Sequence, residues 1–235
     1  MRAVVFQHET HEGLGLLEPA LKAAGFTVVK RFRGVEYHED VEAQLVVALG
    51  GSMGVADTQQ HPFLRDELAV LVERLALERP ILGVCLGSQL LAAAAGGEVS
   101  TGKNGLELGV APVRWTAAGL LDPVVKGVSA KTSVAHWHRD TWKPIPGATL
   151  LASTDRYTQQ AFRLGASYGF QFHCELTADD WSRWLDVSRE SLEADGHDLA
   201  ALKAQGSKLK AAEHELTGLI ERLVHHFAQV ARAAT

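Results

Sequence analysis

Hydrophobic runs of strand length alternate with segments of helical periodicity through the amino-terminal half of the chain. Four such runs occur, at residues 2–6, 26–29, 44–49 and 80–84. Three segments with apolar side chains at helical spacing accompany them, at residues 13–24, 63–78 and 87–95. This alternation is typical of βα units and predicts a parallel sheet. The nearly unbroken run at 44–49 is typical of a strand that is buried on both faces.

The pattern changes after residue 98, where short strand-like runs follow one another. These runs are at residues 106–115, 134–137, 149–153, 159–163 and 168–172. Their close spacing predicts a more antiparallel region. After Thr177 the apolar side chains fall on helical stripes, such as the one that contains Trp181 and Trp184. We therefore predict an α/β fold with an open, mostly parallel sheet flanked by helices, followed by a C-terminal helical extension.

Length and composition fit this picture of a soluble globular protein. The chain has 235 residues, of which 46% are hydrophobic and 22% charged, and its formal net charge is −5. We expect an α/β domain in residues 1–180 and a helical extension, residues 181–235, packed on the same domain. The negative charge argues against a nucleic-acid partner, and the chain contains no apolar run long enough to span a membrane. Two cysteines are too few for a disulfide framework, so we expect a cytoplasmic protein.

A cysteine at the junction of a predicted strand and helix is the first candidate for chemistry. Residues 83–87 have the sequence Gly-Val-Cys-Leu-Gly, and small residues on both sides of Cys85 permit the tight turn of a nucleophile elbow. The turn places the sulfur at the amino end of a helix, an environment that favours the reactive thiolate. The amide of Leu86 can then point toward a developing oxyanion, and a second donor is expected from the loop at Gly51. A buried structural cysteine between packing glycines is the alternative interpretation.

A histidine and a carboxylate two residues apart follow another predicted strand. If the extended geometry continues, His173 and Glu175 lie on the same side of the chain. His173 can exchange a proton with the sulfur while Glu175 orients its imidazole. Cys174 points the other way and is expected to be packed. A surface His–Glu pair is the alternative.

Three ordered motifs together resemble the class I, triad-type glutamine amidotransferases. They are the glycine-rich loop at residues 50–54, the cysteine turn at 83–89, and the Gly-Phe-Gln-Phe-His-Cys-Glu segment at 169–175. Residues 107–109 and 136–140 add similarity to stand-alone members related to the glutaminase domain of GMP synthase. The resemblance implies the family's flavodoxin-like fold, with no cofactor or metal.

The resemblance also implies a role for each matching residue. Cys85 would attack the side-chain amide of glutamine to form a thioester, His173 would protonate the departing ammonia, and Glu175 would complete the triad. The family's oxyanion hole corresponds to the backbone amides of Gly51 and Leu86. By the same resemblance, Gln89, Trp137 and His138 correspond to the family's substrate-binding positions.

The chain departs from the family pattern at three positions. Cys174 stands where the family has proline between the triad histidine and glutamate, Ser52 replaces a proline of the glycine-rich loop, and Arg139 replaces the glycine of His-Gly-Asp. None of these changes removes a triad member. Loss of the proline leaves the backbone between His173 and Glu175 less constrained.

The substrate and partner stay open at this point. Release of ammonia from glutamine would imply a synthetase partner or another acceptor, with a homo-oligomer as an alternative assembly. A γ-glutamyl peptide hydrolase would use the same triad, and a non-catalytic binding protein of the same fold is a further alternative. His136 and His138 have the i, i+2 spacing of some metal sites, but no carboxylate accompanies them in the sequence pattern, so no metal is expected.

Overall fold

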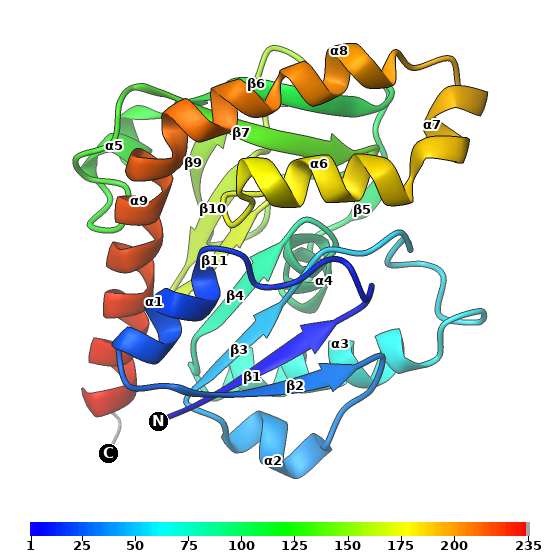
Figure 1. Ribbon diagram of the computed structural model, residues 1–235. Coiled ribbons are helices and arrows are strands. Elements are labelled where there is room, and N and C mark those ends of the chain that lie inside the picture. The colour runs from blue at the N-terminus through cyan, green and yellow to red at the C-terminus, as the bar shows by residue number, and fades with distance from the viewer. Residues whose placement is uncertain (234–235) are drawn as a thin grey trace.

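A mixed β-sheet runs through the centre of the computed structural model, which describes residues 1–233 (Figure 1). Its strands, with those of a second small sheet, are β1 (Arg2–Gln7), β2 (Thr27–Phe32), β3 (Leu45–Ala48), β4 (Ile81–Val84), β5 (Val99–Thr101), β6 (Glu107–Trp115), β7 (Lys131–His138), β8 (Asp140–Trp142), β9 (Thr149–Ser153), β10 (Ala161–Leu164) and β11 (Ser167–Phe170). The nine strands of the large sheet lie in the order β2-β1-β3-β4-β11-β10-β9-β6-β7, and β5 pairs with β8.

The large sheet is parallel from β2 to β11 and antiparallel from β11 to β7. The predicted α/β fold is confirmed, with the antiparallel region where the short runs crowd together. The carboxyl ends of β1, β3, β4 and β11 meet at one edge of the parallel half. Open α/β sheets bind their ligands at this edge.

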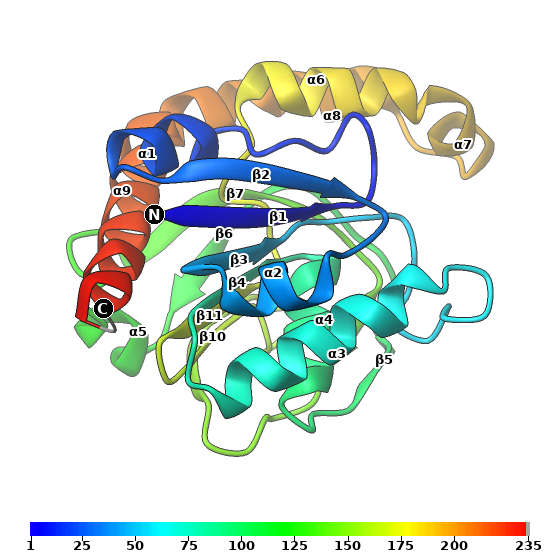
Figure 2. The same ribbon diagram turned by 90° about the horizontal axis from the view of Figure 1, so that it is seen from below.

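Helices cover both faces of the parallel half (Figure 2). The helices of the described residues are α1 (Leu17–Ala23), α2 (Tyr37–Glu42), α3 (Phe63–Ala76), α4 (Leu86–Ala94), α5 (Ala117–Leu121), α6 (Ala178–Val187), α7 (Arg189–Ala194), α8 (Leu199–Ala204) and α9 (Gly206–Ala233). Of these, α1 and α9 pack on one face of the parallel half, and α3 and α4 pack on the other. Side chains of β1 alternate between two hydrophobic clusters: Val5 packs with α1 and α9, and Phe6 packs with α3 and α4. The period of two along a strand therefore produces the two layers of core.

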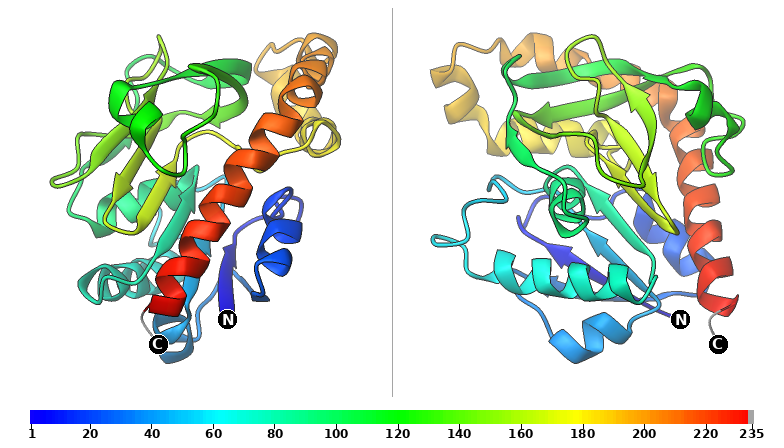
Figure 3. Two further views of the ribbon diagram at one scale, coloured as in Figure 1. Left: turned by 90° about the vertical axis from the view of Figure 1, so that its left-hand side faces the viewer. Right: turned by 180° about the vertical axis from the view of Figure 1, so that it is seen from behind.

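The C-terminal helices pack against the sheet and against α1. Helix α9 crosses one face of the molecule along its length (Figure 3) and contacts α1, α6 and β7. Its buried stripe includes Leu219, Leu223 and Phe227, each with no exposed surface. These side chains belong to the same cluster as Trp181 of α6 and Val5 of β1. No helix within residues 1–233 is long and apolar enough to cross a membrane.

Several element boundaries differ from the sequence prediction for local reasons. The helix expected at residues 13–24 begins only at Leu17, because Gly15 has a positive φ and its Cα lies directly against the carbonyl of Glu175. The strand expected to reach residue 172 ends at Phe170, although the amide of His173 still donates a hydrogen bond to Ala135. Four elements were not predicted, namely α2, α5, β5 and β8; each has only three to six residues, too few for periodicity to register.

Candidate active site

Cys85 occupies the turn between β4 and α4, at the edge where the parallel strands end. Its backbone has φ 50° and ψ −112°, a conformation that costs free energy for a residue with a side chain. Gly87 packs so closely on the carbonyl of Ala48, and Gly83 on that of Gly87, that neither position has room for a Cβ. The Cys85 amide donates to the carbonyl of Phe170 at 2.8 Å, which ties the turn to β11. The two glycines therefore hold a strained cysteine in one orientation.

His173 and Glu175 meet as expected from their spacing. His173 Nδ1 lies 2.7 Å from Glu175 Oε1, and both side chains are buried. Burial lowers the pKa of His173, but the Glu175 carboxylate and a hydrogen bond with Cys85 raise it, and the net result is a pKa well above the usual value. The carbonyl of Glu175 accepts the Leu16 amide at 2.8 Å. The Glu175 carboxylate thus fixes Nδ1, and a Cβ built on Gly50 would touch both the His173 ring and Cys85, so the imidazole and the cysteine lie side by side.

The other predicted site residues line one cavity beside Cys85. This cavity has a volume of about 380 Å³. Its walls include Gly51, Leu86, Gln89, Trp137 and His138. A Cβ built on Gly51 would lie 3.0 Å from the Leu86 side chain, so the two backbone positions assigned to the oxyanion hole are neighbours.

Two of these residues are held by contacts that the sequence did not indicate. Gln89 Nε2 donates to Gln171 Oε1 at 3.2 Å and to the Asp140 carbonyl at 3.3 Å. The Trp137 carbonyl lies 3.6 Å from the Cys85 sulfur, and its indole packs edge-on against Trp181 with ring centroids 5.8 Å apart. Helix α6 therefore supports the wall of the cavity.

A second cavity of about 360 Å³ opens beside Cys85 and His173. The first βα loop lines it with Glu9, His11 and Glu12, and the C-terminal helices contribute Trp184, Ser188 and Ser191. Its position on the histidine side of the sulfur suits the leaving group of an acyl transfer. The C-terminal extension thus contributes part of the wall around Cys85.

Glu12 is the functional candidate that the sequence analysis missed. A Cβ built on Gly50 would lie 2.5 Å from Glu12 Oε2 and 2.9 Å from the His173 ring, so the carboxylate is close to the imidazole. Burial raises the pKa of Glu12 to about 7, although His173 lowers it. Its place in the loop after β1, at the carboxyl edge of the parallel sheet, was the available signal.

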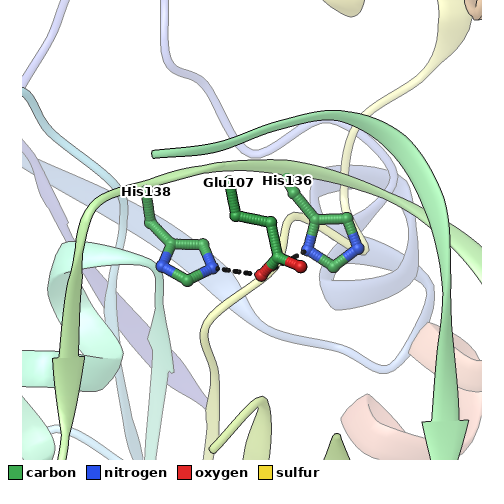
Figure 4. A group of neighbouring side chains, drawn as sticks. All are labelled: Glu107, His136 and His138. Atoms are coloured by element: carbon green, nitrogen blue, oxygen red, sulfur yellow. Dashed lines mark hydrogen bonds and ion pairs between the residues drawn. The ribbon is translucent and has the colours of Figure 1, made fainter. Parts of the chain in front are cut away.

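Glu107 is the second residue that the sequence did not indicate. It lies opposite His138 in the pairing of β6 with β7, and its carboxylate sits between His136 and His138 (Figure 4). The expectation that no carboxylate accompanies these histidines was wrong, because antiparallel pairing brings together residues far apart in the chain.

Comparison with known proteins identifies the family. The model of the family described as glutamine amidotransferase class-I matches residues 25–185. The chain belongs to the class I glutamine amidotransferase family. The match spans the cysteine turn and the His173–Glu175 segment, so the resemblance inferred from the three motifs is confirmed.

Relatives of this chain include a glutamine amidotransferase-like protein, GMP synthases and subunits of GMP synthase. The glutamine amidotransferase-like protein YfeJ of Salmonella typhimurium is 28% identical over 200 residues, which cover 82% of this chain and 83% of YfeJ. A subunit of the glutamine-hydrolysing GMP synthase of Haloquadratum walsbyi is 36% identical over 114 residues, which cover 47% of this chain and 60% of that subunit. The match to the GMP synthase of Pyrobaculum aerophilum covers only 19% of that protein.

Solved structures agree with the amidotransferase fold. A glutamine amidotransferase from Thermotoga maritima superposes with a TM-score of 0.87 at 30% identity, covering 97% of this chain and 98% of that chain. A glutamine amidotransferase from Methylobacillus flagellatus gives a TM-score of 0.82 at 24% identity and supports the fold alone. Both alignments cover nearly the whole chain, C-terminal helices included.

Proposed function

We propose that the protein hydrolyses the side-chain amide of glutamine through a thioester on Cys85. The observation that carries the proposal is the 2.7 Å hydrogen bond between the buried His173 and Glu175, together with the place of His173 and Cys85 in the wall of one cavity. A buried carboxylate that fixes one ring nitrogen leaves the imidazole ready to exchange a proton with the nucleophile.

The reaction has two steps in this proposal. The Cys85 sulfur attacks the amide carbon, the amides of Gly51 and Leu86 stabilise the oxyanion, and the C–N bond breaks as His173 protonates the departing ammonia. Water then attacks the thioester, His173 accepts its proton, and glutamate leaves with the thiol restored. Gln89, Trp137 and His138 would hold the glutamyl part in the cavity of about 380 Å³. No step requires a cofactor.

The destination of the ammonia is inferred from the relatives. Several proteins named as one subunit of a glutamine-hydrolysing GMP synthase are similar to part of this chain, and such a name implies a companion subunit. We propose a synthetase partner that receives the ammonia, in the cytoplasm, where thiols such as the two free cysteines stay reduced.

A second candidate function is supported by the cavity on the histidine side. A volume of about 360 Å³ is far larger than ammonia requires and would accommodate the amine of a γ-glutamyl conjugate. Glu12 lies next to His173 there, whereas the Glu9 carboxylate already pairs with Arg33 and Ser52. The Glu12 carboxylate, 4.0 Å from His11 Nε2, favours a leaving amine that carries a second, positively charged group.

The first experiment measures ammonia released from L-glutamine beside the cleavage of γ-glutamyl amides, with Cys85→Ala as the blank. Cys85-dependent ammonia supports the glutaminase. Cleavage of the amides without ammonia release from glutamine supports the second candidate. Silence of the protein on both, with and without added GMP synthase subunits, would contradict both and favour a binding protein of the same fold.

The role of Cys85 is tested separately by alkylation with iodoacetamide at neutral pH. Burial raises the pKa of the Cys174 thiol well above its usual value, so this cysteine should react slowly. Cys85 is expected to be modified first, as read by peptide mass spectrometry. Equal rates at the two cysteines would count against an activated nucleophile.

Glu12→Gln tests the leaving-group preference. We expect it to lower kcat/KM for the γ-glutamyl amide of a diamine more than for the γ-glutamyl amide of a neutral amine. Glu9→Gln is the matched control in the same loop, and its effect should be smaller because Glu9 is already paired. An unchanged preference in Glu12→Gln would remove Glu12 as its source.

A further inference from the structure

Three side chains with metal-binding atoms converge on one face of the β6–β7 pair (Figure 4). Glu107 and His138 are register partners, and His136 lies two residues before His138 on β7, so their side chains share a face. Glu107 Oε2 lies 2.9 Å from His138 Nε2 and 3.7 Å from His136 Nδ1. The three atoms lie within 4.8 Å of one another.

In both imidazoles, the ring nitrogen that points away from Glu107 is hydrogen-bonded to a backbone carbonyl. His136 Nε2 lies 3.2 Å from the carbonyl of Ala111, and His138 Nδ1 lies 3.0 Å from the carbonyl of Asp140. Because a carbonyl oxygen only accepts, each of these nitrogens must donate a proton. The inward nitrogens are therefore those that face Glu107. Histidines that bind metals are commonly oriented by such a hydrogen bond from the other ring nitrogen.

The ring nitrogen of His136 that faces Glu107 lacks a hydrogen-bond donor among the described residues. His136 is buried, and its Nε2 donates to the Ala111 carbonyl, so in the neutral ring Nδ1 carries the lone pair. This buried nitrogen has no hydrogen-bond partner among the described residues and faces a carboxylate oxygen. Such a contact is unfavourable without a positive charge between the two atoms. A proton on His138 Nε2 would satisfy its contact with Glu107. It would still leave His136 Nδ1 without a hydrogen-bond partner among the described residues.

We propose that Glu107, His136 and His138 bind a divalent transition-metal ion, with zinc as the ion they fit best. Two imidazoles and one carboxylate form a donor set typical of zinc, whereas calcium and magnesium prefer oxygen ligands alone. The Thr154 hydroxyl and the Gln160 amide donate to Glu107 at 2.8 and 2.6 Å and would orient its carboxylate around the ion.

The proposed site lies at the wall of the cavity beside Cys85. His138 lines that cavity, so an ion has a route from solvent to the three side chains. A bound ion would join β6 to β7 at the point where β7 carries Trp137 and His138 into the cavity wall. Ion binding should therefore raise the thermal stability of the protein. This inference does not depend on the proposed glutaminase activity.

The test measures zinc retained by the full-length protein after chelator treatment, reloading with Zn²⁺ and dialysis. We expect one zinc per chain and a higher unfolding temperature than for the chelated protein. His136→Gln keeps a nitrogen in reach of the Ala111 carbonyl, and His138→Asn keeps one in reach of the Asp140 carbonyl, while each removes the inward ligand. Both should weaken zinc binding at least about tenfold.

His226→Gln is the matched control, because His226 also contacts a backbone carbonyl through Nε2, at 3.3 Å from Ala166. It should retain zinc like the parent. If a variant fails to fold, ¹⁵N NMR spectra of the parent protein test the site instead. Addition of Zn²⁺ should shift the resonances of His136 Nδ1 and His138 Nε2. A parent that retains no zinc, equal retention in all variants, or shifts confined to other histidines would overturn the proposal.

Discussion

At the scale of single residues, the backbone of Cys85 shows how the sequence sets up the proposed nucleophile. A φ of 50° with ψ −112° is a conformation that glycine adopts without strain. The strain persists because Gly83, Gly87 and the Phe170 carbonyl leave the turn no other geometry. The sulfur thus projects from the turn into the cavities that the catalytic proposal uses.

This strain predicts an inverted order of stability for two variants. Cys85→Gly should be more stable than Cys85→Ala by about 1 kcal/mol, because glycine relieves the strain and alanine retains it. Inside a helix the order is the opposite, so Ala211→Gly on the exposed side of α9 serves as the control and should lose ~1 kcal/mol. Urea unfolding measures all three. A Cys85→Gly protein less stable than Cys85→Ala would show that the turn is unstrained.

Glu12 predicts a dependence of stability on pH. Its pKa is raised to about 7 in the folded protein from an ordinary value of 4.5, so the folded state binds the proton more tightly than the unfolded state. The stability this gives is present below about pH 4.5 and is lost as the pH rises through 7. Glu12→Gln should therefore exceed the parent by ~1–3 kcal/mol at pH 8, with a smaller difference at pH 5.

Urea unfolding at the two pH values checks this expectation. Glu9→Gln, whose parent carboxylate is paired with Arg33, should show no gain at pH 8. A Glu12→Gln advantage that is the same at both pH values would mean that the buried charge is not its cause.

The residues that local spacing could predict are those whose partners are close in sequence or share a motif. Cys85 lies between two glycines, and His173 and Glu175 are two residues apart, so one strand geometry brings them together. Glu12 and Glu107 meet their partners across elements, and their environment depends on the packing of several strands. A short stretch of sequence therefore does not reveal which residues surround Glu12 or Glu107.

At the scale of elements, the start of α6 is coupled to the candidate triad. Thr177 caps this helix by a capping box: its hydroxyl accepts the Asp180 amide at 3.1 Å, and the Asp180 carboxylate accepts the Thr177 amide at 3.2 Å. The cap lies two residues after Glu175, whose carbonyl is bonded to Leu16. Both ends of this short segment are therefore fixed.

Thr177→Ala should cost about 1 kcal/mol of stability and also lower kcat, because the segment that carries Glu175 loses one of its fixed points. Thr116→Ala is the matched control: Thr116 caps α5 through the Gly119 amide, and no cavity beside Cys85 includes it. It should lose similar stability and keep its activity. Equal kcat values for the two variants would show that the helix cap at Thr177 does not position the candidate triad.

Element prediction succeeded where a segment was long or buried on both faces. The run at 44–49 and the stripe on α9 each contain a pattern that only one type of element satisfies. The start of α1 was wrong because Gly15 is shaped by contact with Glu175, far away in the chain. The three-residue strands β5 and β8 pair with each other and are too short to carry a periodicity.

At the scale of the whole molecule, the C-terminal helices and the sheet share one hydrophobic cluster. Phe227 of α9, Trp181 of α6 and Val5 of β1 belong to it, and Trp184 both packs in this cluster and lines the cavity beside His173. We therefore propose that residues 181–235 unfold together with residues 1–180 rather than as a separate unit.

Phe227→Ala tests this cooperativity. Phe227 has no exposed surface, so its truncation should cost ~3–5 kcal/mol, whereas Gln229→Ala on the exposed side of the same helix should change stability by less than ~0.5 kcal/mol. Tryptophan fluorescence and far-ultraviolet circular dichroism should report the same urea midpoint in each protein, because Trp115, Trp181 and Trp184 share one core cluster with α9. Separate midpoints for the two signals would make the C-terminal helices an independent unit, and their contribution to the wall around Cys85 would then depend on a docking equilibrium.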